Sequence, residues 1–123
     1  MYPTDRHYTT DHEWISVSGT IARIGITDYA QDQLGDVVFV ELPEVGQLFE
    51  PGTQFGSIES VKAVSDLFCP MAGRVVEVKG ALSDRPETVN AGPHDAWMIV
   101  IELKDPSQTD GLLDAAAYTE LVS

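Results

Sequence analysis

Short runs in which apolar and polar residues alternate recur along the chain, and this period-two pattern predicts a mostly β protein. Four runs have the length and the flanking turn residues that are typical of strands: residues 13–19, 20–26, 37–42 and 97–103. A turn at Ser18-Gly19 joins the first two runs, and proline and glycine mark further turns at residues 43–46 and 51–52. The pattern therefore predicts several short strands connected by tight turns.

Three segments interrupt the strand pattern: residues 27–35, 81–88 and 115–122. The first reads as a two-turn helix that either Thr27 or Asp28 can cap, with Gly35 free to take the left-handed conformation past its end. The middle segment is either a short helix or a structured loop. Asp114 can cap the last segment as a C-terminal helix. Small helices are thus expected at the edges of the β structure.

One repeated pattern within the sequence constrains the architecture. The pattern Gly-x-Val-Val-x-Val at residues 35–40 returns at residues 73–78, and each copy then runs to a strand ending in Ile-Glu, at residues 58–59 and 101–102. Two similar halves joined at a hairpin predict a quasi-two-fold sandwich of two antiparallel sheets, with the valine-rich segments in equivalent positions. Chance similarity between valine-rich strands is the alternative.

The size and charge of the chain narrow the classes of function. Its 123 residues fit a single domain over residues 1–123, and 43% of them are apolar, enough for one modest core. Twenty acidic and seven basic residues give a net charge of -13, which argues against nucleic acid and anionic membranes as partners. Such a surface suits docking on basic patches of protein partners, although much of the charge can simply be solvated.

The single cysteine and the start of the chain bear on location. Cys69 has no partner for a disulfide, so a reducing compartment is expected, and a buried structural thiol is favoured over a reactive one. No apolar run approaches the roughly 20 residues that span a bilayer. Residues 1–6 show neither an export signal nor an amphipathic presequence. We expect a soluble protein that is not exported.

Lys62 is one of only three lysines, with Lys79 and Lys104. Apolar residues on both sides of it read as two short strands, which places Lys62 at the tip of a hairpin with its amine in water. A Schiff-base lysine needs burial or a neighbouring cation to lower its pKa, whereas the neighbours here are Glu59 and Asp66. Lys62 is therefore either an ordinary surface lysine or a handle that another enzyme acylates.

Several motifs around this lysine belong together. They are Glu59-Ser-Val-Lys-Ala63, Ser65-Asp66, Pro70 and Gly73, with three further blocks at residues 11–14, 25–35 and 37–43. Over roughly residues 8–122 the chain resembles the glycine cleavage system H protein family, a branch of the lipoyl/biotinyl-domain superfamily. Biotinyl domains normally have Met on both sides of the lysine, so Val61 and Ala63 favour lipoate over biotin.

The resemblance implies a lipoyl-domain-like fold, a barrel-sandwich hybrid of two antiparallel sheets with short peripheral helices and a C-terminal helix. The lipoyl-bearing hairpin would span about residues 56–73, with Pro70 and Gly73 setting its geometry. The protein would be a carrier rather than an enzyme, with (R)-lipoate covalently attached to Lys62. We expect a monomer, located in the cytoplasm if the chain is bacterial or in the mitochondrial matrix if it is a processed eukaryotic form.

The resemblance also implies the partners. A pyridoxal-phosphate-dependent glycine decarboxylase would load an aminomethyl group onto the arm, and a tetrahydrofolate-dependent aminomethyltransferase would unload it. An FAD-containing dihydrolipoamide dehydrogenase would then take the electrons, and lipoate-attaching enzymes would modify Lys62 beforehand. Tethering the group to an arm raises its effective concentration at each site, which is the advantage of a carrier.

In this family the loaded arm folds into a surface cleft, and the resemblance assigns the polar residues of that shelter to Asp11, Glu13 and Asp66. Carboxylates attract the terminal ammonium of the arm, and packing excludes water. The alternatives are that Asp11 and Glu13 face solvent and that Asp66 caps a turn. Glu59 is either a recognition mark for the lipoate-attaching enzyme or the decarboxylase, or only a charge on an exposed strand.

Other functions would keep only parts of this pattern. An H-like lipoyl relay that serves 2-oxoacid dehydrogenases or a signalling assembly would keep Lys62 but would not need the three shelter residues, so their presence favours glycine cleavage. An unmodified interaction domain would not need the spacing of Lys62 from Glu59 and Gly73. The three histidines lack the spacing of metal ligands, so no metal site is expected.

Overall fold

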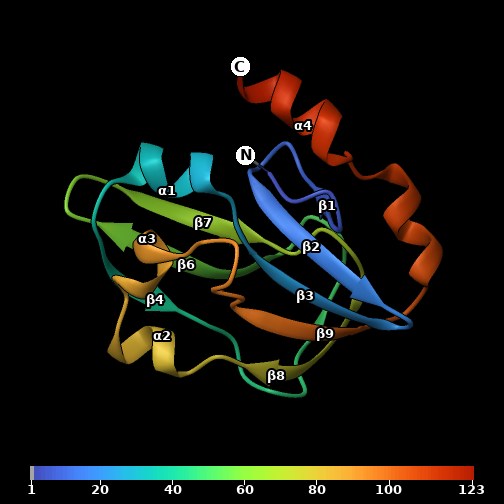
Figure 1. The fold of residues 1–123 in the computed structure, drawn as a ribbon. Coiled ribbons are helices and arrows are strands. Elements are labelled where there is room, and N and C mark those ends of the chain that lie inside the picture. The colour runs from blue at the N-terminus through green and yellow to red at the C-terminus, as the bar shows by residue number, and fades with distance from the viewer. Residues whose placement is uncertain (1) are drawn as a thin grey trace.

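Two antiparallel β-sheets packed on each other form the body of the protein, with short helices at its periphery (Figure 1). The computed structural model describes residues 2–123, apart from the side chain of Asp110. The larger sheet has the strand order β1 (His7–Tyr8), β2 (Glu13–Ser18), β3 (Ile21–Ile26), β9 (Ile99–Leu103), β8 (Gly73–Val78) and β5 (Leu48–Phe49). The smaller has the order β4 (Val37–Glu41), β6 (Gln54–Ser60) and β7 (Val64–Phe68). The predicted antiparallel sandwich is confirmed.

The helices begin and end close to where the sequence signals lie. They are α1 (Asp28–Leu34), α2 (Ala81–Asp84), α3 (Thr88–Ala91), the 3-10 helix η1 (Pro106–Gly111) and α4 (Ala115–Val122). Thr27, rather than Asp28, caps α1, and Gly35 ends it with a φ of 83°. Asp114 caps α4, as predicted. Within residues 2–123 no helix is long and apolar enough to cross a membrane.

The main core lies between the sheets, and its side chains come from alternate strand positions. Ile15 and Ile24, which face each other on β2 and β3, are fully buried, as is Ile99 on β9. Ile58 and Leu67 reach the same cluster from the smaller sheet. This period of two is the one visible in the sequence, because a strand with one buried face needs apolar residues at every second position.

Three details of the strands differ from expectation. β1 and β5 are only two residues long, too short to leave an alternating pattern in the sequence. The last strand begins at Ile99 and not at residue 97. Trp97 lies outside the ladder, where the Lys79 ammonium sits 5.3 Å from the centre of its ring. This tryptophan therefore packs as a half-buried aromatic side chain instead of joining the strand.

The two valine-rich segments occupy comparable positions, each on a strand paired antiparallel with the strand that ends its half. β4 pairs with β6 and β8 pairs with β9, and each pair has a bulge after the first valine, between Val37 and Phe39 and between Val75 and Glu77. The partner strands are offset from the predicted equivalence. Val40 faces Ile58 while Val78 faces Ile99, so the two Ile-Glu pairs, at residues 58–59 and 101–102, differ in register by two residues. A register shift of two residues keeps every side chain on the same face of the strand, so the repeated pattern of apolar residues is compatible with it.

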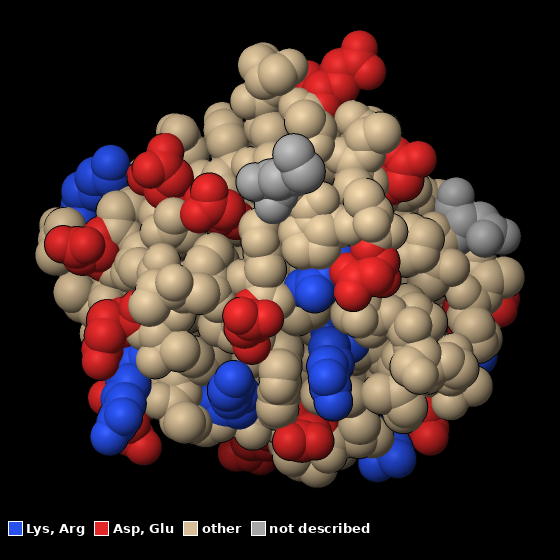
Figure 2. Space-filling model, in the orientation of Figure 1, with Lys and Arg blue, Asp and Glu red and all other residues tan. Residues whose placement is uncertain are grey.

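The negative charge expected from the composition is spread over the surface. On the face shown in Figure 2, acidic side chains form separate patches scattered among residues of other kinds, with basic ones between them. Among residues 2–123 only two ion pairs form, Arg6 with Asp5 at 3.1 Å and Arg74 with Glu102 at 3.9 Å. Most of the twenty acidic residues are thus available to a basic surface of another protein.

Gly56→Ala should destabilise the protein by about 2–4 kcal/mol, because the added Cβ would overlap the backbone oxygen of Glu41 and push β4 away from β6. Gly80→Ala is the matched control, since no heavy atom lies within 4 Å of its added Cβ. Its backbone is already helical, with a φ of -57°. Urea denaturation measures both. Equal losses of unfolding free energy in the two variants would contradict the close approach at Gly56.

Candidate functional site

Lys62 lies exposed at the tip of the hairpin formed by β6 and β7, where the sequence placed it. Hydrogen bonds fix the backbone of the tip. The N–H of Ser60 donates to the carbonyl of Ala63 at 2.8 Å, and the buried hydroxyl of Ser60 accepts the N–H groups of Lys62 at 3.2 Å and of Ala63 at 3.0 Å. The N–H of Val61 donates to the Asp36 carbonyl at 3.1 Å. The lysine thus extends from a rigid support that is tied to the start of β4.

The side chain of Lys62 runs over the end of α1. A Cβ built on Gly35 would be 3.3 Å from Lys62 Cε, so the absence of a side chain at this position makes room for the lysine stem. Neither Glu59 nor Asp66 makes an ion pair with Lys62. The stem is therefore packed on backbone while the residue as a whole stays exposed to solvent.

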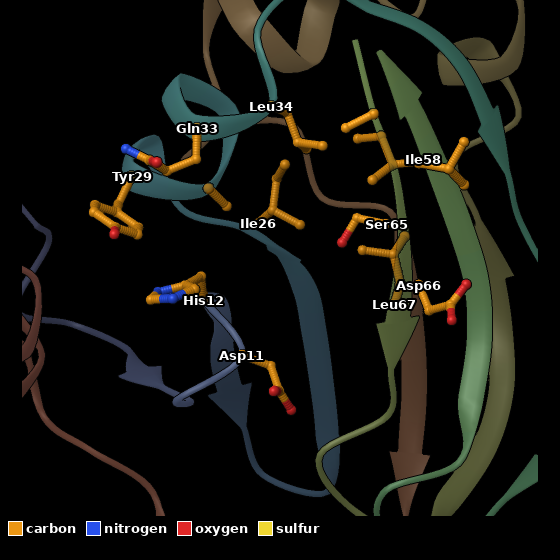
Figure 3. Close-up of a pocket in the computed structure, with 13 residues that line it drawn as sticks. Asp11, His12, Ile26, Tyr29, Gln33, Leu34, Ile58, Ser65, Asp66 and Leu67 are labelled. Atoms are coloured by element: carbon orange, nitrogen blue, oxygen red, sulfur yellow. The ribbon is translucent and has the colours of Figure 1, made fainter.

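A cleft of about 410 Å³ begins beside this lysine. It lies between the free edge of β7, the helix α1 and the loop that precedes β2 (Figure 3). Seven apolar residues line it: Ile26, Ala30, Leu34, Ile58, Ala63, Val64 and Leu67. Six polar residues complete the lining: Asp11, His12, Tyr29, Gln33, Ser65 and Asp66. An apolar groove with a few polar groups suits an elongated ligand that has one polar end.

The helix α1 supplies one wall of the cleft through a single face. Tyr29, Ala30, Gln33 and Leu34 line it, and these positions repeat at the spacing of one helical turn. On the opposite wall, Figure 3 shows Ser65 of β7 directed toward the space between the walls. The sequence motifs pointed to no individual role for Tyr29, Gln33 or Ser65. The spacing on α1 was a usable signal, but nothing in the sequence said which structure the helix faces.

His12 is the most constrained residue of the lining. It has a φ of 68°, the only positive value at a non-glycine residue in the part of the chain described. Its Nδ1 lies 2.8 Å from the hydroxyl of Tyr118 on α4, and its ring lies 4.6 Å from that of Tyr29. Burial lowers the pKa of His12. The Tyr118 hydroxyl is also 2.7 Å from the hydroxyl of Thr27, the cap of α1, so one buried phenol connects both walls of this corner to the C-terminal helix.

Asp11 and Asp66 both line the cleft, but their carboxylates are not brought together. In Figure 3 the Asp66 side chain points away from Asp11. Its carboxylate accepts a hydrogen bond of 3.1 Å from the side-chain amide of Gln54. Asp66 lies within β7, so the alternative that it caps a turn is wrong. Asp11 is exposed, which fits either a solvated charge or a group at the rim of the cleft.

Glu13 is placed differently, because it is buried behind the cleft. It is 2% exposed, so the alternative of a solvent-facing Glu13 is wrong, and it is absent from the cleft lining. One carboxyl oxygen accepts the N–H of Phe68 at 2.9 Å, and the other lies 3.5 Å from the hydroxyl of Thr9. Burial raises the pKa of Glu13 to about 8, although the Phe68 N–H opposes this shift. The residue joins β2 to the end of β7.

The remaining predicted residues lie around the hairpin. Glu59 is exposed on the outer face of β6. Pro70 and Gly73 follow β7, so they lie outside the paired strands at residues 54–68, and a Cβ on Gly73 would be 2.6 Å from the carbonyl oxygen of Glu102. Gly73 thus serves the contact between β8 and β9. Cys69 is fully buried and burial raises its pKa to about 11, which supports a structural thiol.

Comparison with known proteins finds similarity along the whole chain. The glycine cleavage H-protein family matches residues 6–123. Glycine cleavage system H proteins of Myxococcus xanthus and Symbiobacterium thermophilum are 55% and 56% identical over 121 and 117 residues, which is 98% and 94% of this chain and 94% and 91% of theirs. A crystal structure of a glycine cleavage system H protein from Mycobacterium marinum matches with a TM-score of 0.90 and 41% identity, covering 98% of both chains.

Glu13→Gln should alter the pH dependence of stability. The pKa of Glu13 is raised in the folded protein. The stability that its protonated carboxyl group contributes is therefore fully present below the ordinary pKa of 4.5, and it is lost as the pH rises through about 8. Glutamine keeps an acceptor for the Phe68 N–H and cannot ionise. Between about pH 5 and about pH 9 the variant should gain a few kcal/mol of unfolding free energy relative to the parent.

Urea denaturation at several pH values measures this difference. Glu59→Gln is the control, because it removes an exposed carboxylate on β6 instead of the buried one on β2. If the unfolding free energies of the parent and of Glu13→Gln change in parallel over this pH range, Glu13 does not have the raised pKa in solution.

Proposed function

The chain belongs to the glycine cleavage H-protein family and has the lipoyl-carrier role of that family in the glycine cleavage system, and we propose that Lys62 is the residue that bears the lipoyl group. The observation that carries the proposal is the position of this lysine. It is exposed at the tip of a hairpin whose backbone is held by the Ser60 hydroxyl and by the Asp36 carbonyl. A modifying enzyme can therefore reach the amine without unfolding any part of the sheet.

The attachment needs an activated acyl group, either an acyl adenylate or a thioester, which the attaching enzyme supplies. Deprotonated Nζ attacks the carbonyl carbon, the amide C–N bond forms, and the bond to the leaving group breaks with its electron pair. The ammonium gives up two protons in all, one to a base and one to the leaving group. Within residues 2–123, the groups that hydrogen-bond to the tip are backbone amides and the Ser60 hydroxyl, and none of them is a base for this step. The carrier is thus the substrate of this step.

When bound, the lipoyl group would supply a disulfide able to accept an aminomethyl group from a pyridoxal-phosphate-dependent glycine decarboxylase, to offer it to a tetrahydrofolate-dependent aminomethyltransferase, and to be reoxidised by dihydrolipoamide dehydrogenase. The chain's own residues hold and shelter this arm. From the lysine Cα the arm reaches on the order of 14 Å. The cleft starts at Ala63 and Val64, next to the attachment point, so the arm can enter it directly.

The lining of the cleft fits the arm in chemistry. The apolar side chains between α1 and β7 can cover the hydrocarbon part of the arm and exclude water from its end. Asp11 at the rim supplies a negative charge for a terminal ammonium, and Ser65 adds a hydroxyl that faces the cleft. Asp66 also lines the cleft, but its carboxylate points away from Asp11. Glu13 acts indirectly, as a positioning residue that holds the end of β7 against β2.

Lys62→Arg should abolish lipoylation while leaving the fold intact, because an exposed tip residue contributes less than about 0.5 kcal/mol to stability. Lys79→Arg and Lys104→Arg are the controls and should be modified like the parent. Intact mass after incubation with a lipoate-attaching enzyme and lipoate measures the outcome, and peptide mapping locates the adduct. An adduct on Lys79 or Lys104, or glycine turnover supported by Lys62→Arg, would show that the attachment site is elsewhere.

Asp11→Asn should weaken the shelter. A charge-assisted hydrogen bond at a partly exposed site is worth about 1–2 kcal/mol, so the loaded arm should lose its aminomethyl cargo severalfold faster. The rate of formaldehyde release from purified loaded protein measures this loss. Asp84→Asn on α2, outside the cleft lining, is the control for the change in net charge. Equal release from both variants and the parent would remove Asp11 from the shelter.

A further inference from the structure

A small hollow lies on the outer face of the larger sheet, apart from the cleft. Its volume is about 130 Å³, and its lining shares no residue with that of the cleft. Ser16 of β2 and Arg23 of β3 line it side by side, because they face each other in the strand register and alternate with the buried Ile15 and Ile24. Arg6, which directly precedes β1 beside β2, lines the hollow as well. Two arginines and a hydroxyl group therefore border one small space.

The guanidinium group of Arg6 is held in place by its neighbours. Its central carbon lies 4.5 Å from the centre of the Trp14 ring, its Nη1 donates to the carbonyl of His94 at 2.6 Å, and its Nε donates to the carboxylate of Asp5 at 3.1 Å. Trp14 is itself fixed, because its indole N–H donates to the carbonyl of Pro93 at 3.0 Å. The side chain of Arg6 is only 14% exposed, yet its Nη2 makes no hydrogen bond within residues 2–123 and is not buried. This nitrogen is a preorganised donor that a ligand can use.

The other polar groups of the lining have unused hydrogen-bonding capacity too. In the part of the chain that the structure describes, neither the exposed guanidinium of Arg23 nor the hydroxyl of Ser16 makes a hydrogen bond or an ion pair. Asp95 also lines the hollow and is exposed, but no ion pair joins it to either arginine. His94 is already engaged, because its Nε2 accepts the N–H of Asp28 at 3.2 Å. The hollow thus borders cations and a carboxylate that do not neutralise each other directly.

We propose that this hollow is a binding site for a small α-amino acid in its zwitterionic form. The carboxylate of the ligand accepts hydrogen bonds from the guanidinium groups of Arg6 and Arg23 and from the hydroxyl of Ser16. Its ammonium group faces the carboxylate of Asp95. Guanidinium groups suit this role, because their planar forks match the two oxygens of a carboxylate. The site needs neither Lys62 nor the arm, so it is independent of the proposed function.

Net charge and size select a small zwitterion over other anions. The chain carries a charge of -13, which repels phosphate and simple carboxylates, whereas a ligand with no net charge is not repelled. A volume of about 130 Å³ holds about four water molecules, which suits glycine and leaves little space for a longer side chain. Trp97 borders the hollow, but the ammonium of Lys79 already lies 5.3 Å from the centre of its ring. The ammonium of the ligand is therefore expected at Asp95 and not over this ring.

The test titrates the full-length unmodified protein, labelled with nitrogen-15, with glycine at constant ionic strength and neutral pH. The chain has two tryptophans, and both border the hollow, so their indole N–H signals in NMR spectra report binding directly. Glycine should shift both signals in a saturable way, with a dissociation constant on the order of millimolar, because only a few charge-assisted hydrogen bonds hold it at an open site.

Variants test the residues that hold the ligand. Arg23→Gln should weaken glycine binding about tenfold, because it removes the guanidinium from the carboxylate of the ligand. Arg85→Gln is the matched control, since it removes the same charge from an exposed arginine at the end of α2, outside the lining. Ser16→Ala, which only shortens a side chain, gives a second measure and should weaken binding severalfold. Asp95→Asn should lower the affinity for glycine to near that for acetate, which has no ammonium group.

Three further ligands decide between a zwitterion site and a general anion site. Acetate and methylamine each carry one of the two charges of glycine, so the parent protein should bind each of them at least about tenfold more weakly than glycine. Acetate or phosphate that binds as tightly as glycine would make the hollow a general anion site and overturn the inference. It is also overturned if glycine causes no saturable shift, or if Arg23→Gln, Ser16→Ala and Arg85→Gln all bind glycine like the parent.

Discussion

The arrangement of the whole site depends on one strand edge that stays unpaired. β7 is the last strand of the three-stranded sheet, and no strand of the larger sheet pairs with it. At its end, the buried carboxyl group of Glu13 accepts the N–H of Phe68 and joins β7 to β2. Because a side chain makes this connection at a single point, the rest of the edge stays open. The cleft occupies that opening, with α1 as its other wall.

Because of this edge strand, the hairpin of β6 and β7 has two exposed faces. One side faces the cleft through alternate residues of β7, and the other carries the row of Phe39, Glu59 and Val64. Lys62 lies between them at a tip that hydrogen bonds hold rigid. A carrier has to offer its lysine to an enzyme and then protect what the lysine carries. A period-two strand separates these tasks, since neighbouring residues point to opposite faces.

The distant C-terminal helix also takes part, through Tyr118. This fully buried residue stacks on Tyr8 with ring centres 4.8 Å apart, and its hydroxyl lies within hydrogen-bonding distance of both His12 and Thr27. His12 lines the cleft and Thr27 caps the helix that forms its wall. The unusual backbone of His12 is thus supported from behind by an aromatic cluster, which keeps the polar corner of the cleft in place.

The sequence by itself determined the elements that rest on local chemistry: the strands with alternating residues, the cap Asp114, the turn that exposes Lys62 and the membership of a carrier family. For α1 it offered Thr27 or Asp28 as the cap, and the structure selects Thr27. The sequence could not place Glu13, because a glutamate before a tryptophan reads the same whether it faces water or a backbone N–H of β7. The sequence also could not show that the carboxylates of Asp11 and Asp66 point in different directions. Nor could it show that Phe39 is exposed, because its apolar segment looks like a core strand. Those outcomes depend on which strand is an edge and on which face a bulge turns outward, and only the packing of distant segments decides them.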